Sequence, residues 1–129
     1  MNQFPFASLI TLLVVSLMFW TAINVGRARA KYGIQVPATT GHDIFERIYR
    51  VQMNTLEAAA LMLPALWVYA TTIGDRGAAL AGLIWLAGRL WYAMAYPKDP
   101  AKRGGGFGVA TLALAGLWLG GLWGVIRTL

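Results

Sequence analysis

The sequence predicts an all-α integral membrane protein, a transmembrane bundle of four helices. Hydrophobic residues make up 58% of the 129 residues and charged residues only 12%. In soluble domains, charged residues usually make up about a quarter. Four apolar segments of about 20 residues follow one another, and each is long enough to cross about 30 Å of hydrocarbon. A water-soluble domain of this size would need a more polar exterior. We therefore expect residues 1–129 to form one membrane domain.

The four predicted spans differ in polarity. The first, from about Phe4 to Gly26, and the fourth, from about Gly106 to Ile126, contain no charge. The third, from about Gly77 to Tyr96, contains one charged residue, Arg89. The second has an amphipathic first part from Asp43 and an apolar body to Thr72. The second span is therefore the unusual one.

Local signals mark the start and the middle of the second span. Asp43 is a suitable N-cap, and Glu46 three residues later would complete a capping box. Pro64 lies inside the span and is expected to kink it. The run from Ile73 to Arg76 is short and polar, so we expect a tight turn that places the second and third spans side by side and antiparallel.

The basic residues predict an orientation in the membrane. Six of them lie in the first and third loops: Arg27, Arg29, Lys31, Lys98, Lys102 and Arg103. The opposite side has only Arg76 and Arg127. The positive-inside rule then places loops one and three in the cytosol and both termini outside. This orientation accounts for the net charge of +6 without a nucleic-acid partner, and the compact loops lead us to expect a bacterial inner membrane.

The composition also excludes some chemistry. The chain has no cysteine, so thiol nucleophiles, disulfides and cysteine-bound metals are excluded. His42 is the one histidine, and the five acidic residues are scattered, so we expect no metal site.

A polar stripe runs along the first turns of the second span. At about 100° per residue, its side chains fall within an arc of about 100°: Glu46, Arg47, Arg50, Asn54 and Glu57. Gln52 points the opposite way, which suits a site built between subunits. An ionisable group at the centre of a span costs about 2.5–3.5 kcal/mol on insertion scales. A stripe present at that cost usually marks a binding site.

The third span has a matching polar face. Arg89, Tyr92 and Tyr96 follow one another at i, i+3 and i+7, within about 60° of arc, and Arg103 follows in the loop. Two antiparallel spans would bring both faces into one pocket that opens toward the cytosol. It would be lined by Arg47, Arg50, Asn54, Glu57, Arg89, Tyr92, Tyr96 and Arg103.

This set of side chains suits a small zwitterionic ligand with a peptide-like middle. Arginines grip carboxylates in a bidentate manner, Glu57 can bind an ammonium group, and Asn54 can pair with an amide. Glutathione has all of these groups. The alternative is structural: Glu46 with Arg50, and Glu57 with Arg50 or Arg89, would be ion pairs that hold the bundle together.

Three segments resemble one known family. The stretch Glu46–Glu57 resembles the second-helix signature E-R-x-x-R-x-Q-x-N-x-x-E of the membrane-associated proteins in eicosanoid and glutathione metabolism (MAPEG). Gly88–Tyr96, followed by Pro100–Arg103, is a second match. Gly26–Gly33 resembles the first loop of microsomal glutathione transferases, type three above all.

The resemblance implies a homotrimer of four-helix subunits with glutathione between neighbours, near the cytosolic face. By motif position, the glutathione ligands would be Arg50, Asn54, Glu57, Tyr92 and Tyr96, with Gln52 reaching in from the adjacent subunit. Arg103 matches the arginine that activates the thiol in leukotriene-C synthase, and Arg29 roughly matches a first-loop arginine. Two positions depart from the pattern: Ala58 stands where many glutathione-using members have tyrosine, and Ala30 where leukotriene-C synthase has a second loop arginine.

The expected activity is that of a detoxifying glutathione transferase or peroxidase. Glutathione, as co-substrate, would add to a lipophilic electrophile that arrives through the membrane lipid, or would reduce a lipid hydroperoxide. One alternative is a non-catalytic lipid-binding scaffold of the same fold. The other is a small four-span multidrug exporter with Glu57 as its proton-coupled carboxylate, which Arg50 and Asn54 beside it disfavour.

Overall fold

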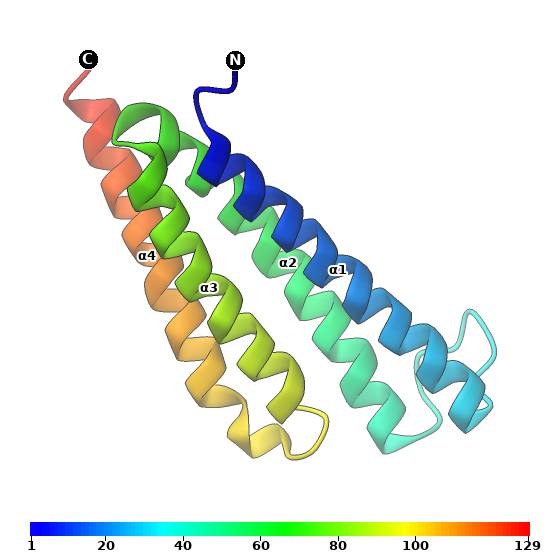
Figure 1. Ribbon diagram of the computed structural model, residues 1–129. Helices are drawn as coiled ribbons and strands as arrows, with labels where there is room; N and C mark the ends of the chain where they lie inside the picture. The colour runs from blue at the N-terminus through cyan, green and yellow to red at the C-terminus, as the bar shows by residue number, and fades with distance from the viewer.

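Four long helices lie alongside one another in the computed structural model, which describes residues 1–129 (Figure 1). They are α1 (Pro5–Tyr32), α2 (Asp43–Thr72), α3 (Asp75–Ala95) and α4 (Gly104–Ile126), and the short 3-10 helix η1 (Pro100–Arg103) precedes α4. Both termini and the α2–α3 turn lie at one end of the bundle, and the other two connections lie at the opposite end (Figure 1). The all-α prediction is confirmed.

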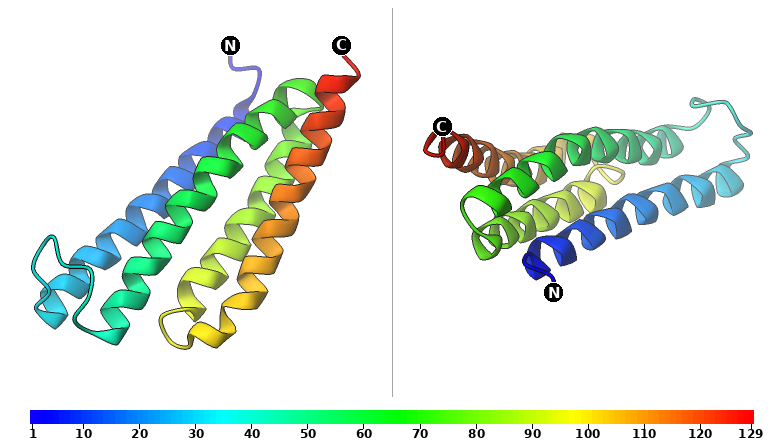
Figure 2. Two further views of the ribbon diagram at one scale, coloured as in Figure 1. Left: turned by 180° about the vertical axis from the view of Figure 1, so that it is seen from behind. Right: turned by 90° about the horizontal axis from the view of Figure 1, so that it is seen from above.

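The middle of the bundle is formed by α2 and α3. Each of these helices packs against the other, against α1 and against α4, and Figure 2 shows α1 and α4 on opposite sides of this central pair. The largest fully buried side chains include Trp85, Met62, Leu66 and Leu117. The two sides of the central pair therefore have different neighbours, and each side has its own hollows.

Three helical segments are long and apolar enough to cross a membrane: α1, α3 and the stretch Pro100–Ile126. Helix α2 is not among them, although it has 30 residues and lies beside the others along the bundle (Figure 1). Its first four turns carry the polar stripe. Large apolar side chains such as Phe19, Leu61 and Leu112 are exposed on the surface of the bundle, as lipid contact requires.

The beginning of α2 differs from the prediction. The N-cap is His42 rather than Asp43, because the imidazole Nδ1 accepts a hydrogen bond from the backbone N–H of Ile44 at 3.1 Å. Asp43 is the first helical residue, where its negative charge interacts favourably with the positive end of the helix dipole. Glu46 accepts from the N–H of Gly41 at 3.3 Å. The helix therefore begins one residue earlier than predicted, and the predicted capping box between Asp43 and Glu46 does not form.

The other helix ends agree with the prediction to different degrees. Helix α1 continues six residues beyond the predicted Gly26 and stops at Tyr32, where Gly33 adopts a left-handed conformation with φ of 67°. The turn between α2 and α3 is as tight as predicted. Helix α2 is one continuous element through Pro64.

Helices α3 and α4 approach each other closely at two glycines. A Cβ atom on Gly88 would lie 2.7 Å from the backbone N of Ala110, and one on Gly106 would lie 2.6 Å from the backbone O of Gly88. Neither position has room for a side chain. This close approach sets the distance between the two helices next to the predicted site.

Candidate functional site

A hollow of about 460 Å³ lies between α2, α3 and α4, and we call it the main hollow. It brings together five of the residues predicted for the site: Asn54, Glu57, Arg89, Tyr92 and Arg103. The rest of its wall is mostly apolar and includes Leu61, Trp85, Phe107 and Leu114. A few polar groups in a largely apolar wall are typical of small-molecule sites, and the volume lies within their usual range of about 300–1,000 Å³.

The floor of the main hollow is a hydrogen-bonded pair from two helices. Asn54 of α2 donates from Nδ2 to the hydroxyl oxygen of Tyr92 on α3 at 2.6 Å. Tyr92 is only 1% exposed, so packing and this bond fix its ring. The Tyr92 hydroxyl still has its own proton to donate, and the Asn54 carbonyl can still accept. The pair can therefore serve a ligand as donor and acceptor.

Arg89 lies deep in the same hollow and is 3% exposed. Its guanidinium donates to the Thr55 hydroxyl at 2.9 Å and lies over the Tyr92 ring, 4.2 Å from the centroid. Its Nε atom is buried without a hydrogen-bond partner. A buried cation is costly unless an anion or several acceptors satisfy it. Because Arg89 donates to Thr55 and not to Glu57, its charge is available to an anionic ligand.

Arg50 and Tyr96 line a second hollow of about 410 Å³ beside the first loop, which we call the end hollow. Its wall also includes Glu46 and Arg47. The rings of Tyr92 and Tyr96 lie 5.4 Å apart, centroid to centroid, so the two hollows are neighbours along one polar face. Sequence reasoning predicted a single pocket, and the structure of the chain divides the same residues between two.

One wall of the main hollow was missed by the sequence reasoning. Phe107, Ala110, Thr111 and Leu114 of α4 line it. Their spacing of i, i+3, i+4 and i+7 places them on one helix face. That pattern is present in the sequence, but the fourth span contains no charged residue that would mark this face as part of a site.

The family of the chain follows from comparison with known proteins. The family model of MAPEG matches residues 7–123, nearly the whole chain. The chain belongs to the MAPEG family. With the apolar helices, this membership identifies the chain as a membrane protein with a glutathione-related function at the level of the family.

Individual relatives agree with the MAPEG assignment. An uncharacterized protein of Synechocystis is 46% identical over 92% of this chain and 87% of its own length. Microsomal glutathione S-transferase 2 of Homo sapiens is 33% identical over 92% of this chain and 81% of its own length. Leukotriene C4 synthase of Cavia porcellus is 39% identical over 73% of this chain, but the match spans only 63% of that synthase.

Two residues predicted from the MAPEG resemblance lie outside both hollows. Arg29 donates to the carbonyl of Ala38 at 2.7 Å, and its guanidinium lies 5.1 Å from the centroid of the Phe45 ring. It therefore ties the end of α1 to the first loop. Gln52 is half-buried and lines neither hollow. Within one chain, neither side chain belongs to the site.

The MAPEG departure at Ala58 lies in the wall of the main hollow itself. Ala58 is half-buried on α2, one residue after Glu57. A tyrosine here would add a hydroxyl group at the wall. Ala30, the other departure, is exposed on the last turns of α1 and lines neither hollow.

Proposed function

We propose that the protein is a membrane glutathione transferase that binds glutathione in the main hollow and adds its thiolate to a lipophilic electrophile. The observation that carries the proposal is the convergence of Asn54, Tyr92 and Arg89, whose Nε has no hydrogen-bond partner, in one hollow of a mostly apolar bundle. Arg89 is available to a carboxylate of glutathione, Glu57 to its ammonium group, and the Asn54–Tyr92 pair to its peptide groups.

The reaction uses the thiol of the substrate as nucleophile. In conjugation, the sulfur bonds to the electrophilic carbon, the leaving group departs with the electron pair of the broken bond, and the thiol proton goes to solvent. In hydroperoxide reduction, two glutathione molecules are oxidised to the disulfide, and the hydroperoxide becomes an alcohol and water. Both routes need a thiolate, and Arg103 at the exposed edge of the main hollow would stabilise it.

The proposal extends to assembly and orientation. Gln52 and Arg29 would complete the site of a neighbouring subunit in a homotrimer, which would explain why neither lines a hollow of its own chain. The first loop and the α3–α4 connection lie at the same end of the bundle (Figure 1). We propose that this basic end faces the cytosol of a bacterium and that glutathione enters from this side. We also propose that α2 crosses the membrane together with the three more apolar helices.

The direct test is glutathione binding and turnover by the purified protein in detergent. Isothermal titration should show saturable binding of glutathione, and an aromatic chloride such as chlorodinitrobenzene should be conjugated with release of chloride. A lipid hydroperoxide is assayed in parallel, to separate transferase from peroxidase activity. Glutathione binding without turnover of any substrate would favour the non-catalytic scaffold. Absence of glutathione binding would contradict the proposed function.

A substitution at Ala58 tests whether the main hollow is the glutathione site. Ala58→Tyr should tighten glutathione binding about fivefold, because one net hydrogen bond contributes about 1 kcal/mol. Ala58→Phe is the matched control, since it adds the ring without the hydroxyl. The dissociation constants are measured by titration in the same detergent. Equal affinities of the Tyr and Phe variants would show that no ligand group reaches this wall.

A further inference from the structure

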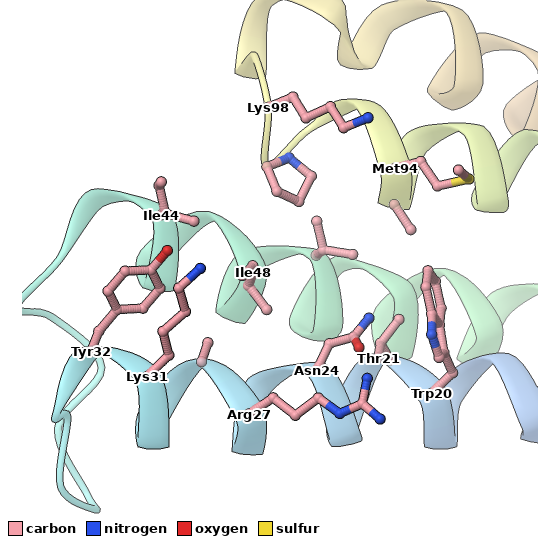
Figure 3. Close-up of a pocket in the computed structure, with 14 residues that line it drawn as sticks. Trp20, Thr21, Asn24, Arg27, Lys31, Tyr32, Ile44, Ile48, Met94 and Lys98 are labelled. Atoms are coloured by element: carbon pink, nitrogen blue, oxygen red, sulfur yellow. The ribbon is translucent and has the colours of Figure 1, made fainter.

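A third hollow of about 380 Å³ lies between α1, α2 and α3, and we call it the basic hollow (Figure 3). Three cations line it: Arg27 and Lys31 from the last turns of α1, and Lys98 from the loop after α3. No acidic side chain lines it, and its other walls are mainly apolar, with Ile48 and Met94 among them. Neither the main hollow nor the end hollow shares a residue with it.

The three cations are not neutralised by the chain. Their side chains are exposed, and Lys31 has a tyrosine ring as its neighbour, with Nζ 5.4 Å from the centroid of Tyr32. Figure 3 shows the polar ends of Lys31 and Tyr32 side by side above α1. Positive charge around a hollow without a carboxylate favours an anion as its occupant.

An apolar groove adjoins the basic hollow and lies along the middle of α1. The groove has a volume of about 480 Å³ and lies between α1 and α3, with Leu13, Leu17 and Ala87 in its wall. Trp20 lines both the groove and the basic hollow, so the two are contiguous. From Asn24 in the basic hollow to Leu13 in the groove, α1 rises about 16 Å at 1.5 Å per residue, which is close to half of the roughly 30 Å hydrocarbon core.

We propose that the basic hollow and the groove together bind one anionic phospholipid. The phosphate would lie among Arg27, Lys31 and Lys98, and one acyl chain would lie along the groove past Trp20. The combined length of the hollow and the groove from Asn24 to Leu13 matches the depth of a single leaflet, and the charge matches an anionic headgroup. Orientation in the membrane alone would require basic residues at this end, but it would not require a hollow that continues into an apolar groove.

The test counts lipids bound to the intact protein by native mass spectrometry in detergent, with phosphatidylglycerol and phosphatidylcholine offered separately. Phosphatidylglycerol should give the more abundant adduct. Lys98→Gln should lower its retention about fivefold, since one basic residue near an anionic surface contributes about 1 kcal/mol. Lys102→Gln is the matched control, because it removes the same charge from the same connection and Lys102 does not line the basic hollow.

A second variant tests the groove without changing any charge. Ala87→Trp fills the apolar groove from α3 and should displace phosphatidylglycerol while the number of chains per complex stays the same. Equal retention of the two lipids would overturn the proposal, as would equal losses in Lys98→Gln and Lys102→Gln. A changed number of chains in Ala87→Trp, with lipid retention unaltered, would show that protein covers the groove, and would also overturn it.

Discussion

Gly106→Ala is expected to push α4 away from α3 and to abolish glutathione binding. A Cβ atom at this position would lie 2.5 Å from the backbone N of Tyr92 and 2.6 Å from the backbone O of Gly88. Backbone atoms cannot rotate away as a side chain can, so the helices must separate. Overpacking usually costs about 1–3 kcal/mol, and we expect the upper part of that range. Tyr92 of α3 and Phe107 of α4 both line the main hollow, so the site would widen as the two helices separate.

The matched control is Gly108→Ala, two residues further along α4. A Cβ atom there would meet no atom within 4 Å, and alanine favours a helix over glycine by about 1 kcal/mol. This variant should unfold at the same temperature as the parent or slightly above it. Thermal unfolding in detergent and glutathione titration are measured on both variants. If the two variants behave alike, the close approach of α3 and α4 does not hold the site together.

The number and order of the helices could be predicted from hydrophobicity alone, but their ends could not. Apolar residues stop near Gly26, whereas the hydrogen-bonded helix continues to Tyr32, because charged residues such as Arg27 are good helix formers at an exposed helix end. The predicted N-cap of α2 was wrong by one residue because two neighbouring side chains can fill that role. Asp43 and His42 both accept hydrogen bonds, and the backbone conformation that selects between them is not visible in the sequence.

The meeting of the polar faces of α2 and α3 could be predicted, because helical spacing decides which side chains share a face. Asn54 and Tyr92 do form a hydrogen bond between α2 and α3, as antiparallel packing of the two predicted faces requires. The division into two hollows could not be predicted. It depends on where Tyr96 and the first loop close the space around Arg50, and that is a matter of packing.

Arg89 shows how burial changes the interpretation of a charge. From the sequence, it is one arginine of several on the polar faces. In the structure it is 3% exposed, it donates to Thr55, and it leaves Nε unpaired. The structural ion pair with Glu57 was an equally reasonable expectation. Only the folded structure distinguishes a cation that is already neutralised from one that can still bind an anion.

Arg103→Ala should lower the conjugation rate at pH 7 by about 25-fold while weakening glutathione binding only about fourfold, which is the loss that linkage to the thiol pKa requires. A free thiol has a pKa of about 8.5 and is a few per cent ionised at pH 7. If the Arg103 cation lowers that pKa to about 6.5, a stabilisation of about 2.7 kcal/mol, about three quarters of the bound thiol is ionised in the parent. Most of the affinity persists because Arg89 and Asn54, which also line the main hollow, would still bind glutathione.

The pH profile separates this role from simple binding. The thiolate is the reactive form, so the parent rate should rise with pH and level off above about 6.5, whereas the variant rate should keep rising to about 8.5. The two rates should therefore converge near pH 9. Lys102→Ala removes an equal charge from the preceding residue of η1, which lies outside the main hollow, and should keep the parent profile. An Arg103→Ala profile parallel to the parent's, or the same change in Lys102→Ala, would show that Arg103 does not ionise the thiol.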